Sequence, residues 1–147
     1  MPIPARITVI TLGARDLPAL RDFYAGLGWE LAIPGDEFAA FATSGAVLTL
    51  YPLSNLAADA RSGEAPPPQG VGMSLAINVD ERDEVNSAID ALRAAGATIL
   101  KEPEDADWGG RAAYWADPEG NVWEVAWVPS DNAMATAIRA ASGIELP

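Results

Sequence analysis

The chain has 147 residues, half of them hydrophobic, so it is long and apolar enough to form one domain with a buried core. Nine basic and 21 acidic residues give a net charge of −12, and no Lys/Arg cluster is present, which argues against a nucleic-acid partner. The absence of histidine and cysteine excludes disulfides, thiolate chemistry and histidine-based metal sites.

The sequence predicts neither a membrane-spanning segment nor a signal peptide. The longest mostly apolar stretch, residues 38–53, is interrupted by polar residues and is too short for a span. The first residues lack a basic segment followed by a long apolar run, so no signal peptide is expected. We therefore expect a cytoplasmic protein.

The first half of the chain begins with a strand pattern over residues 6–12, which are rich in β-branched side chains. Asp16 then predicts a helix N-cap, and apolar residues recur at helical spacing until Gly28. Further strands are expected over residues 29–33, 38–43 and 46–51, with Gly-containing turns between them.

The second half repeats this order. A strand is predicted over residues 73–79, Asp80 is the expected cap, and the next helix ends before Gly96. The following strands are expected over residues 98–101, 112–116 and 122–128. The repeated order indicates two similar modules in one chain.

Two segments lie outside this repeat. Residues 54–70 contain three consecutive prolines and predict a linker-like loop between the modules. After residue 129, Ser130 or Asp131 could cap a C-terminal helix over about residues 130–142, with Met134 and Ile138 on one face.

Two motifs carry a resemblance to a known family. The first runs from Thr11 to Asp16 and leads to Phe23-Tyr24 and Leu27-Gly28-Trp29, and the second is the run from Asp117 to Asn121. Together they resemble the glyoxalase/bleomycin-resistance/extradiol-dioxygenase superfamily, also called the vicinal-oxygen-chelate superfamily. The match covers roughly residues 6–128.

The resemblance implies an α+β fold in which two βαβββ modules form an open, cup-shaped sheet around a ligand site. The modules would span about residues 6–53 and 71–128 of a single domain covering residues 1–147. It also implies metal ligands at the positions of Val9, Thr49, Ser74 and Glu124. Only Glu124 is a competent ligand for a transition metal, so we expect no bound metal and no other cofactor.

Three interpretations of Glu124 stay open. Alternation along a strand puts it on the cup side, with Trp123, Val125 and Trp127 facing the helices. There Glu124 could be a general base, since proton abstraction next to a carbonyl suits a partly buried carboxylate. It could instead bind or counter the charge of a ligand, or it could be a relic satisfied by neighbouring hydroxyl groups.

The segment before the last hairpin offers further candidates. Trp108 precedes two glycines that favour a sharp turn, so its ring could stack on a ligand or pack in the core. Tyr114 and Arg111 are weaker candidates. The full set of predicted ligand-binding residues is Glu124, Trp108, Tyr114, Tyr51, Thr49, Ser74 and Arg111.

These residues favour a protein that binds a small organic molecule in a metal-free cup, of the sequestration or resistance type. Cationic ligands would suit a carboxylate beside aromatic faces. One alternative is a metal-independent lyase or isomerase that uses Glu124 as general base. The other is a non-catalytic interaction module whose cup is filled by side chains.

Members of the family commonly pair, and each half presents strand edges that a second chain could cover. We therefore predict a homodimer, with Met134 and Ile138 of the last helix packed across the contact. Light scattering at micromolar concentration should give twice the chain mass. The monomer mass would contradict the prediction.

Overall fold

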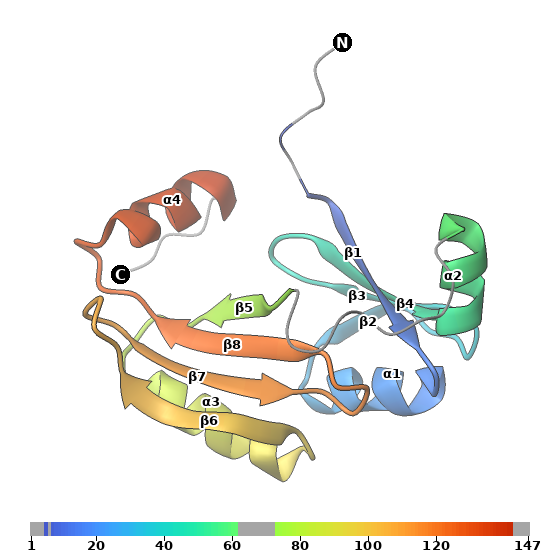
Figure 1. Cartoon of the computed structure of the whole chain (residues 1–147), viewed down its shortest axis with the longest axis horizontal. Coiled ribbons are helices and arrows are strands. Elements are labelled where there is room, and N and C mark those ends of the chain that lie inside the picture. The colour runs from blue at the N-terminus through green and yellow to red at the C-terminus, as the bar shows by residue number, and fades with distance from the viewer. Residues whose placement is uncertain (1–4, 6, 62–72, 143–147) are drawn as a thin grey trace. The chain divides into compact units, whose positions relative to one another are not determined.

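The computed structural model describes residues 5, 7–61 and 73–142, and the chain divides into two compact units, Met1–Pro66 and Pro67–Pro147. Each unit contains one βαβββ module followed by a helix (Figure 1). The fold is therefore α+β with two βαβββ modules, as the sequence predicts. Each module is described by itself below.

The first module contains a mixed four-stranded sheet with the order β1-β4-β3-β2. Strands β1 and β4 are parallel, whereas the β2–β3 and β3–β4 pairs are antiparallel. Its elements are β1 (Val9–Ala14), α1 (Leu17–Gly26), β2 (Glu30–Ile33), β3 (Ala39–Ala42) and β4 (Val47–Pro52).

Helix α1 begins and ends where the sequence predicts. The Asp16 carboxylate accepts a hydrogen bond from the Ala19 backbone N–H at 3.1 Å, which satisfies one of the donors left unpaired at a helix N-terminus. Gly28 follows the helix with a φ of +86°, a conformation that favours glycine. Both predictions for this helix are confirmed.

An aromatic cluster forms the core of the first module. Tyr24 of α1 is fully buried, and its ring lies 5.1 Å from that of Phe23, 5.4 Å from that of Trp29 and 5.9 Å from that of Phe41. These centroid distances are within the range in which aromatic pairs add stability beyond their buried area. The cluster joins α1 to the sheet.

The loop expected over residues 54–70 is partly helical, so that expectation is wrong for its first part. Helix α2 (Leu53–Ala60) packs against β1 and β4. A side chain at Gly13 would begin 2.7 Å from Leu53 Cδ1, so glycine in β1 lets the helix approach the sheet closely. The proline-rich part of the expected loop lies outside the described residues.

The second module repeats the topology, with the order β5-β8-β7-β6 and a parallel β5–β8 pair. Its elements are β5 (Leu75–Asn78), α3 (Glu84–Ala94), β6 (Thr98–Asp105), β7 (Arg111–Ala116) and β8 (Val122–Trp127). Helix α4 (Ala133–Ser142) follows the last strand and confirms the predicted C-terminal helix. No helix in the described part of the chain is long and apolar enough to cross a membrane.

The predicted cap of the second helix is wrong. Asp80 is exposed, and α3 begins at Glu84, with Asp83 as its N-cap. The Glu84 carboxylate accepts a hydrogen bond from the Glu81 backbone N–H at 2.7 Å, so a short turn is stabilised before the helix starts. Sequence alone favoured the first acidic residue after the strand and missed this turn.

The two faces of the second sheet differ in composition. Helix α3 covers one face of the sheet (Figure 1). It packs there through the buried residues Val85, Ile89 and Leu92, and the buried rings of Trp115 and Trp123 stack on the same face with their centroids 5.3 Å apart. Because side chains alternate along a strand, Glu124 lies on the opposite face. The predicted orientation of Trp123 toward the helix side is confirmed by its burial and stacking.

The run from Asp117 to Asn121 forms the turn between β7 and β8. The buried Asp117 carboxylate accepts hydrogen bonds from the backbone N–H groups of Glu119 and Asn121, both at 2.9 Å, and from the Asn121 side chain at 2.8 Å. Gly120 has a φ of +84°. This motif therefore sets the geometry of the hairpin that carries Glu124.

Candidate functional site

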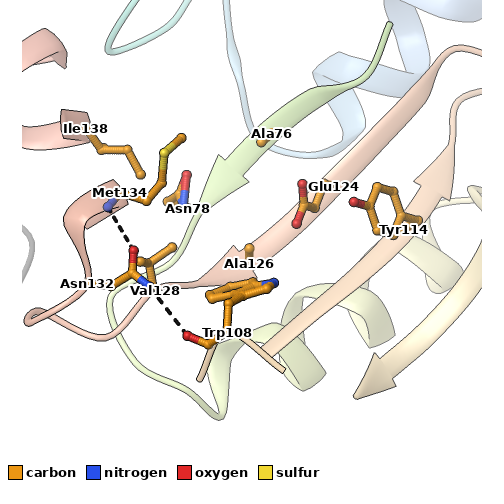
Figure 2. Close-up of a pocket in the computed structure, with 10 residues that line it drawn as sticks. All are labelled: Ala76, Asn78, Trp108, Tyr114, Glu124, Ala126, Val128, Asn132, Met134 and Ile138. Atoms are coloured by element: carbon orange, nitrogen blue, oxygen red, sulfur yellow. Dashed lines mark hydrogen bonds between the residues drawn. The ribbon is translucent and has the colours of Figure 1, made fainter. Parts of the chain in front are cut away.

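A pocket of about 450 Å³ lies in the second module, on the face of the sheet opposite α3 (Figure 2). Strands β5, β7 and β8 contribute its floor, while α4 and the loop before β7 contribute its walls. The lining residues are Ala76, Asn78, Trp108, Tyr114, Glu124, Ala126, Val128, Asn132, Met134 and Ile138.

Small side chains create the space around Glu124. In the parallel β5–β8 pair, Ala76 is the register partner of Glu124 and Asn78 is the partner of Ala126. Ala126 also lies two residues after Glu124 and shares its face. Methyl groups on two sides leave the carboxylate accessible from within the pocket, as Figure 2 shows.

The corresponding face of the first module carries hydroxyl groups where the second module carries Glu124. There the β1–β4 pairing brings together Thr11 and Thr49, whose hydroxyl oxygens lie 2.7 Å apart and form a hydrogen bond. Next along β1, Gly13 is covered by α2. The same topology therefore gives a hydrogen-bonded hydroxyl pair in one module and an accessible carboxylate in the other.

Tyr114 is the polar neighbour of Glu124 on β7. The two residues are register partners, and their side chains point toward one another in Figure 2. Burial raises the pKa of the Tyr114 hydroxyl first, and the negative charge and hydrogen bond of Glu124 raise it further. At neutral pH Tyr114 is thus a neutral donor to a carboxylate.

Lys101 lies on β6 as the register partner of Tyr114, so Lys101, Tyr114 and Glu124 are neighbours across three strands. Its ammonium group lies 2.9 Å from the Glu104 carboxylate, and this pairing raises the pKa of Lys101. The charges of Tyr114 and Glu124 contribute to the same shift less strongly. Lys101 does not line the pocket, since its side chain is engaged by Glu104 near the edge of the sheet.

Two glycines position the Trp108 ring. Gly109 has a φ of +96°, which confirms the predicted sharp turn. At Gly110 a side chain would overlap the Trp108 ring and the Trp127 carbonyl oxygen, so only glycine admits the ring at this place. Trp108 itself is 46% exposed, which rules out the alternative of a core residue.

Asn132 joins two walls of the pocket. Its side-chain amide donates to the Trp108 carbonyl oxygen at 3.4 Å, and its Oδ1 accepts from the Met134 backbone N–H at 2.8 Å (Figure 2). The helix cap expected at Ser130 or Asp131 is therefore supplied by Asn132. One side chain holds both the loop that carries Trp108 and the start of α4.

Of the predicted site residues, the structure brings together Glu124, Tyr114 and Trp108. Arg111 instead bonds the Asn86 side chain at 2.9 Å, Asp105 at 3.1 Å and the Pro103 carbonyl at 3.2 Å, and it does not line the pocket. The guanidinium groups beside Asp105, those of Arg82 and Arg111, lower the pKa of that carboxyl group.

The other predicted residues lie elsewhere. Thr49 and Tyr51 belong to the first module, where Thr49 pairs with Thr11 and the Tyr51 hydroxyl donates to Asp59 at 3.3 Å. Ser74 is exposed and precedes β5 by one residue, so Ala76 takes the place beside Glu124.

Sequence reasoning missed most of the apolar lining. Met134 and Ile138, which were assigned to a dimer contact, line the pocket of their own chain. The homodimer itself stays a prediction. Their helical spacing was the available signal, but it did not show which surface the helix would cover. Asn78, Ala76 and Val128 gave no local signal at all.

The donor set does not fit the metal that the family resemblance implies. Val9 and Ser74 are exposed, Thr49 is occupied by Thr11, and the nearest polar neighbour of Glu124 is a neutral phenol. Among the residues that the structure describes, no three His, Cys, Asp or Glu side chains are grouped to hold a metal ion. A single carboxylate does not hold a transition metal against water.

Comparison with known families agrees with this architecture. The sequence model described as Glyoxalase/Bleomycin resistance protein/Dioxygenase superfamily matches residues 6–125, which include both modules up to β8. The chain belongs to this superfamily. Among curated proteins, none matches the chain significantly.

Solved structures of superfamily proteins share the fold. A glyoxalase-related enzyme from Fulvimarina pelagi is 35% identical, with a TM-score of 0.76 over 86% of this chain and 90% of that one. A glyoxalase/bleomycin resistance protein/dioxygenase from Nocardioides is 27% identical, with a TM-score of 0.73 over 90% and 89%. Lactoylglutathione lyase from Agrobacterium tumefaciens, at 22% identity and a TM-score of 0.63 over 85% and 95%, resembles this chain in fold alone.

Replacing Gly110 by alanine should displace the Trp108 ring. The added methyl group meets both the ring and a backbone oxygen, so we expect a loss of roughly 1–3 kcal/mol in the free energy of unfolding, as in overpacked sites. The matched control is Gly45→Ala, because a side chain there meets open space. Urea unfolding of both variants gives the comparison, and equal stabilities would contradict the proposed ring position.

Replacing Glu124 by glutamine should lower the pKa of Tyr114 part of the way toward the ordinary tyrosine value of about 10. Burial remains in this variant, whereas the negative charge is removed. Because the Tyr114 pKa is higher in the folded state than in the unfolded state, the free energy of unfolding is unaffected by this group below the unfolded pKa. It falls as the pH rises from the unfolded pKa through the folded pKa. A titration of ¹³Cζ-labelled tyrosine, with Tyr114→Phe to assign the signal, measures the shift. An unchanged midpoint would show that the two side chains do not interact.

Proposed function

We propose that the protein binds a small organic molecule in the pocket of the second module, without a metal ion, as a sequestration or resistance protein does. The observation that carries this proposal is the accessible Glu124 carboxylate in a cavity of about 450 Å³ lined largely by apolar side chains. Concave, mostly apolar sites with a few polar groups are the usual form of small-molecule sites, and their volumes are about 300–1,000 Å³.

The composition of the pocket supports binding of apolar ligand surface. Trp108, Val128, Met134 and Ile138 provide an aromatic and aliphatic wall, and burial of such surface drives association. Glu124 and Tyr114 are then available to orient the polar part of the ligand. The space between them and α4 argues against an interaction module whose face is filled by side chains.

A second candidate is a metal-independent lyase or isomerase that uses Glu124 as general base. The hydroxyl of Tyr114 favours it, because a protonated phenol beside a carboxylate supplies a donor where negative charge develops on a substrate carbonyl. The 35% identical relative from Fulvimarina pelagi is described as a glyoxalase-related enzyme, which is consistent with this candidate.

Two substitutions test the site. In Ala76→Phe, a large side chain grows from an exposed position into the space beside Glu124, so it should abolish binding of any ligand of the pocket while the protein stays folded. Glu124→Ala should weaken binding tenfold or more, because a hydrogen bond to a charged group contributes about 1.5–3 kcal/mol and 1.4 kcal/mol corresponds to tenfold.

The assay is a small-molecule library screened by thermal shift, with each hit titrated into the parent, both variants and a chelator-treated sample. Hits that bind Ala76→Phe as tightly as the parent, or that lose binding after chelator treatment, would contradict the proposal. A hit that is turned over by the parent and bound but not turned over by Glu124→Gln would establish the lyase or isomerase instead.

A further inference from the structure

The charge of the residues that line the pocket indicates which charge its ligand should carry. Among the described residues that line it, Glu124 is the charged one, and none is lysine or arginine. Two cations of the module have anionic or amide partners outside the pocket: Lys101 pairs with Glu104, which affects it more strongly than Glu124 does, and Arg111 pairs with Asp105 and Asn86. Among the described residues that line the pocket, the negative charge of Glu124 therefore has no cationic partner.

Tyr114 does not neutralise this charge. Its hydroxyl points toward the Glu124 carboxylate (Figure 2), and its raised pKa keeps it neutral, so the charge of the carboxylate stays in place. On the opposite side, Ala76 provides no polar atom to compete for the carboxylate. A partly desolvated carboxylate of this kind favours a cationic partner and disfavours an anion, which would have to approach like charge.

The wall across the pocket suits the body of such a cation. Trp108 presents an indole whose place is fixed by Gly110 and Asn132, and α4 adds the Met134 and Ile138 side chains (Figure 2). An indole attracts a cation over its face and also packs against aliphatic or aromatic groups. Methionine adapts to irregular apolar shapes.

We propose that the pocket takes an organic ammonium ion with an apolar body, its nitrogen at the Glu124 carboxylate and its body against Trp108 and Met134. This ligand class rests on the proposed binding function and makes it more specific. The net charge of −12 agrees with it, since a negative protein raises the rate at which cations arrive.

The test compares three soluble probes that share one body and differ in charge: 2-phenylethylammonium, 2-phenylethanol and phenylacetate. Their dissociation constants are measured with the full chain by NMR chemical-shift titration. We expect the ammonium ion to bind at least tenfold more tightly than the alcohol, and phenylacetate to bind most weakly. Added salt should reduce the advantage of the ammonium ion, because exposed charges are screened.

Two variants show whether Glu124 is the cause. Glu124→Gln keeps the shape of the side chain and removes its charge, so it should abolish the preference for the ammonium ion. Glu30→Gln, at an exposed position of β2 in the first module, changes the net charge equally and should keep the preference. Equal affinities for ammonium and alcohol in the parent, or a preference that survives Glu124→Gln, would overturn the ligand class.

Ala76→Phe separates failure of the ligand class from failure of the binding function. If alcohol and ammonium bind equally and Ala76→Phe blocks both, the pocket binds small molecules but not ammonium ions in particular. If none of the three probes binds, the hits of the small-molecule library screened by thermal shift provide the test. Cationic hits blocked by Ala76→Phe support the ligand class, neutral or anionic hits overturn it, and the absence of any blocked hit overturns the binding function as well.

Discussion

The parallel pairing of the first and last strands of the second module determines the site. It places Ala76 beside Glu124 on one side, while the antiparallel β7–β8 pairing places Tyr114 on the other. A shift of one residue in either pairing would turn Glu124 toward α3 or give it different neighbours, because side chains alternate along a strand. The opposite face resists such a shift, since Trp115 and Trp123 stack there in the core.

The two modules share a topology but differ in how the helix after the last strand is placed, and this difference forms the pocket. In the first module, α2 follows β4 directly and packs closely on Gly13. In the second module, a longer connection leads from β8 to α4, and Asn132 holds the start of that helix against the Trp108 loop. The helix then forms a wall instead of a close cover.

Glu124 occupies the position at which the family resemblance implies a metal ligand. Its register partners are Ala76, with a methyl side chain, and Tyr114, with a phenol, and neither is a strong metal donor. Under the proposed function, apolar contact with Trp108 would supply affinity and the charge of Glu124 would supply specificity. Under this proposal, sequestration and proton transfer would differ in one respect, which is whether the bound molecule has a proton that Glu124 can remove.

The sequence by itself determined the two modules, the cap at Asp16, the turn at Gly109 and the face on which Glu124 lies. These features depend on periodicity, turn residues and caps, which are local properties of the chain. Only the tertiary structure decided that Ala76, Asn132 and Met134 line the same pocket as Glu124 while Arg111 does not. Those neighbours depend on strand register and on where α4 packs, and both follow from contacts between residues far apart in the chain.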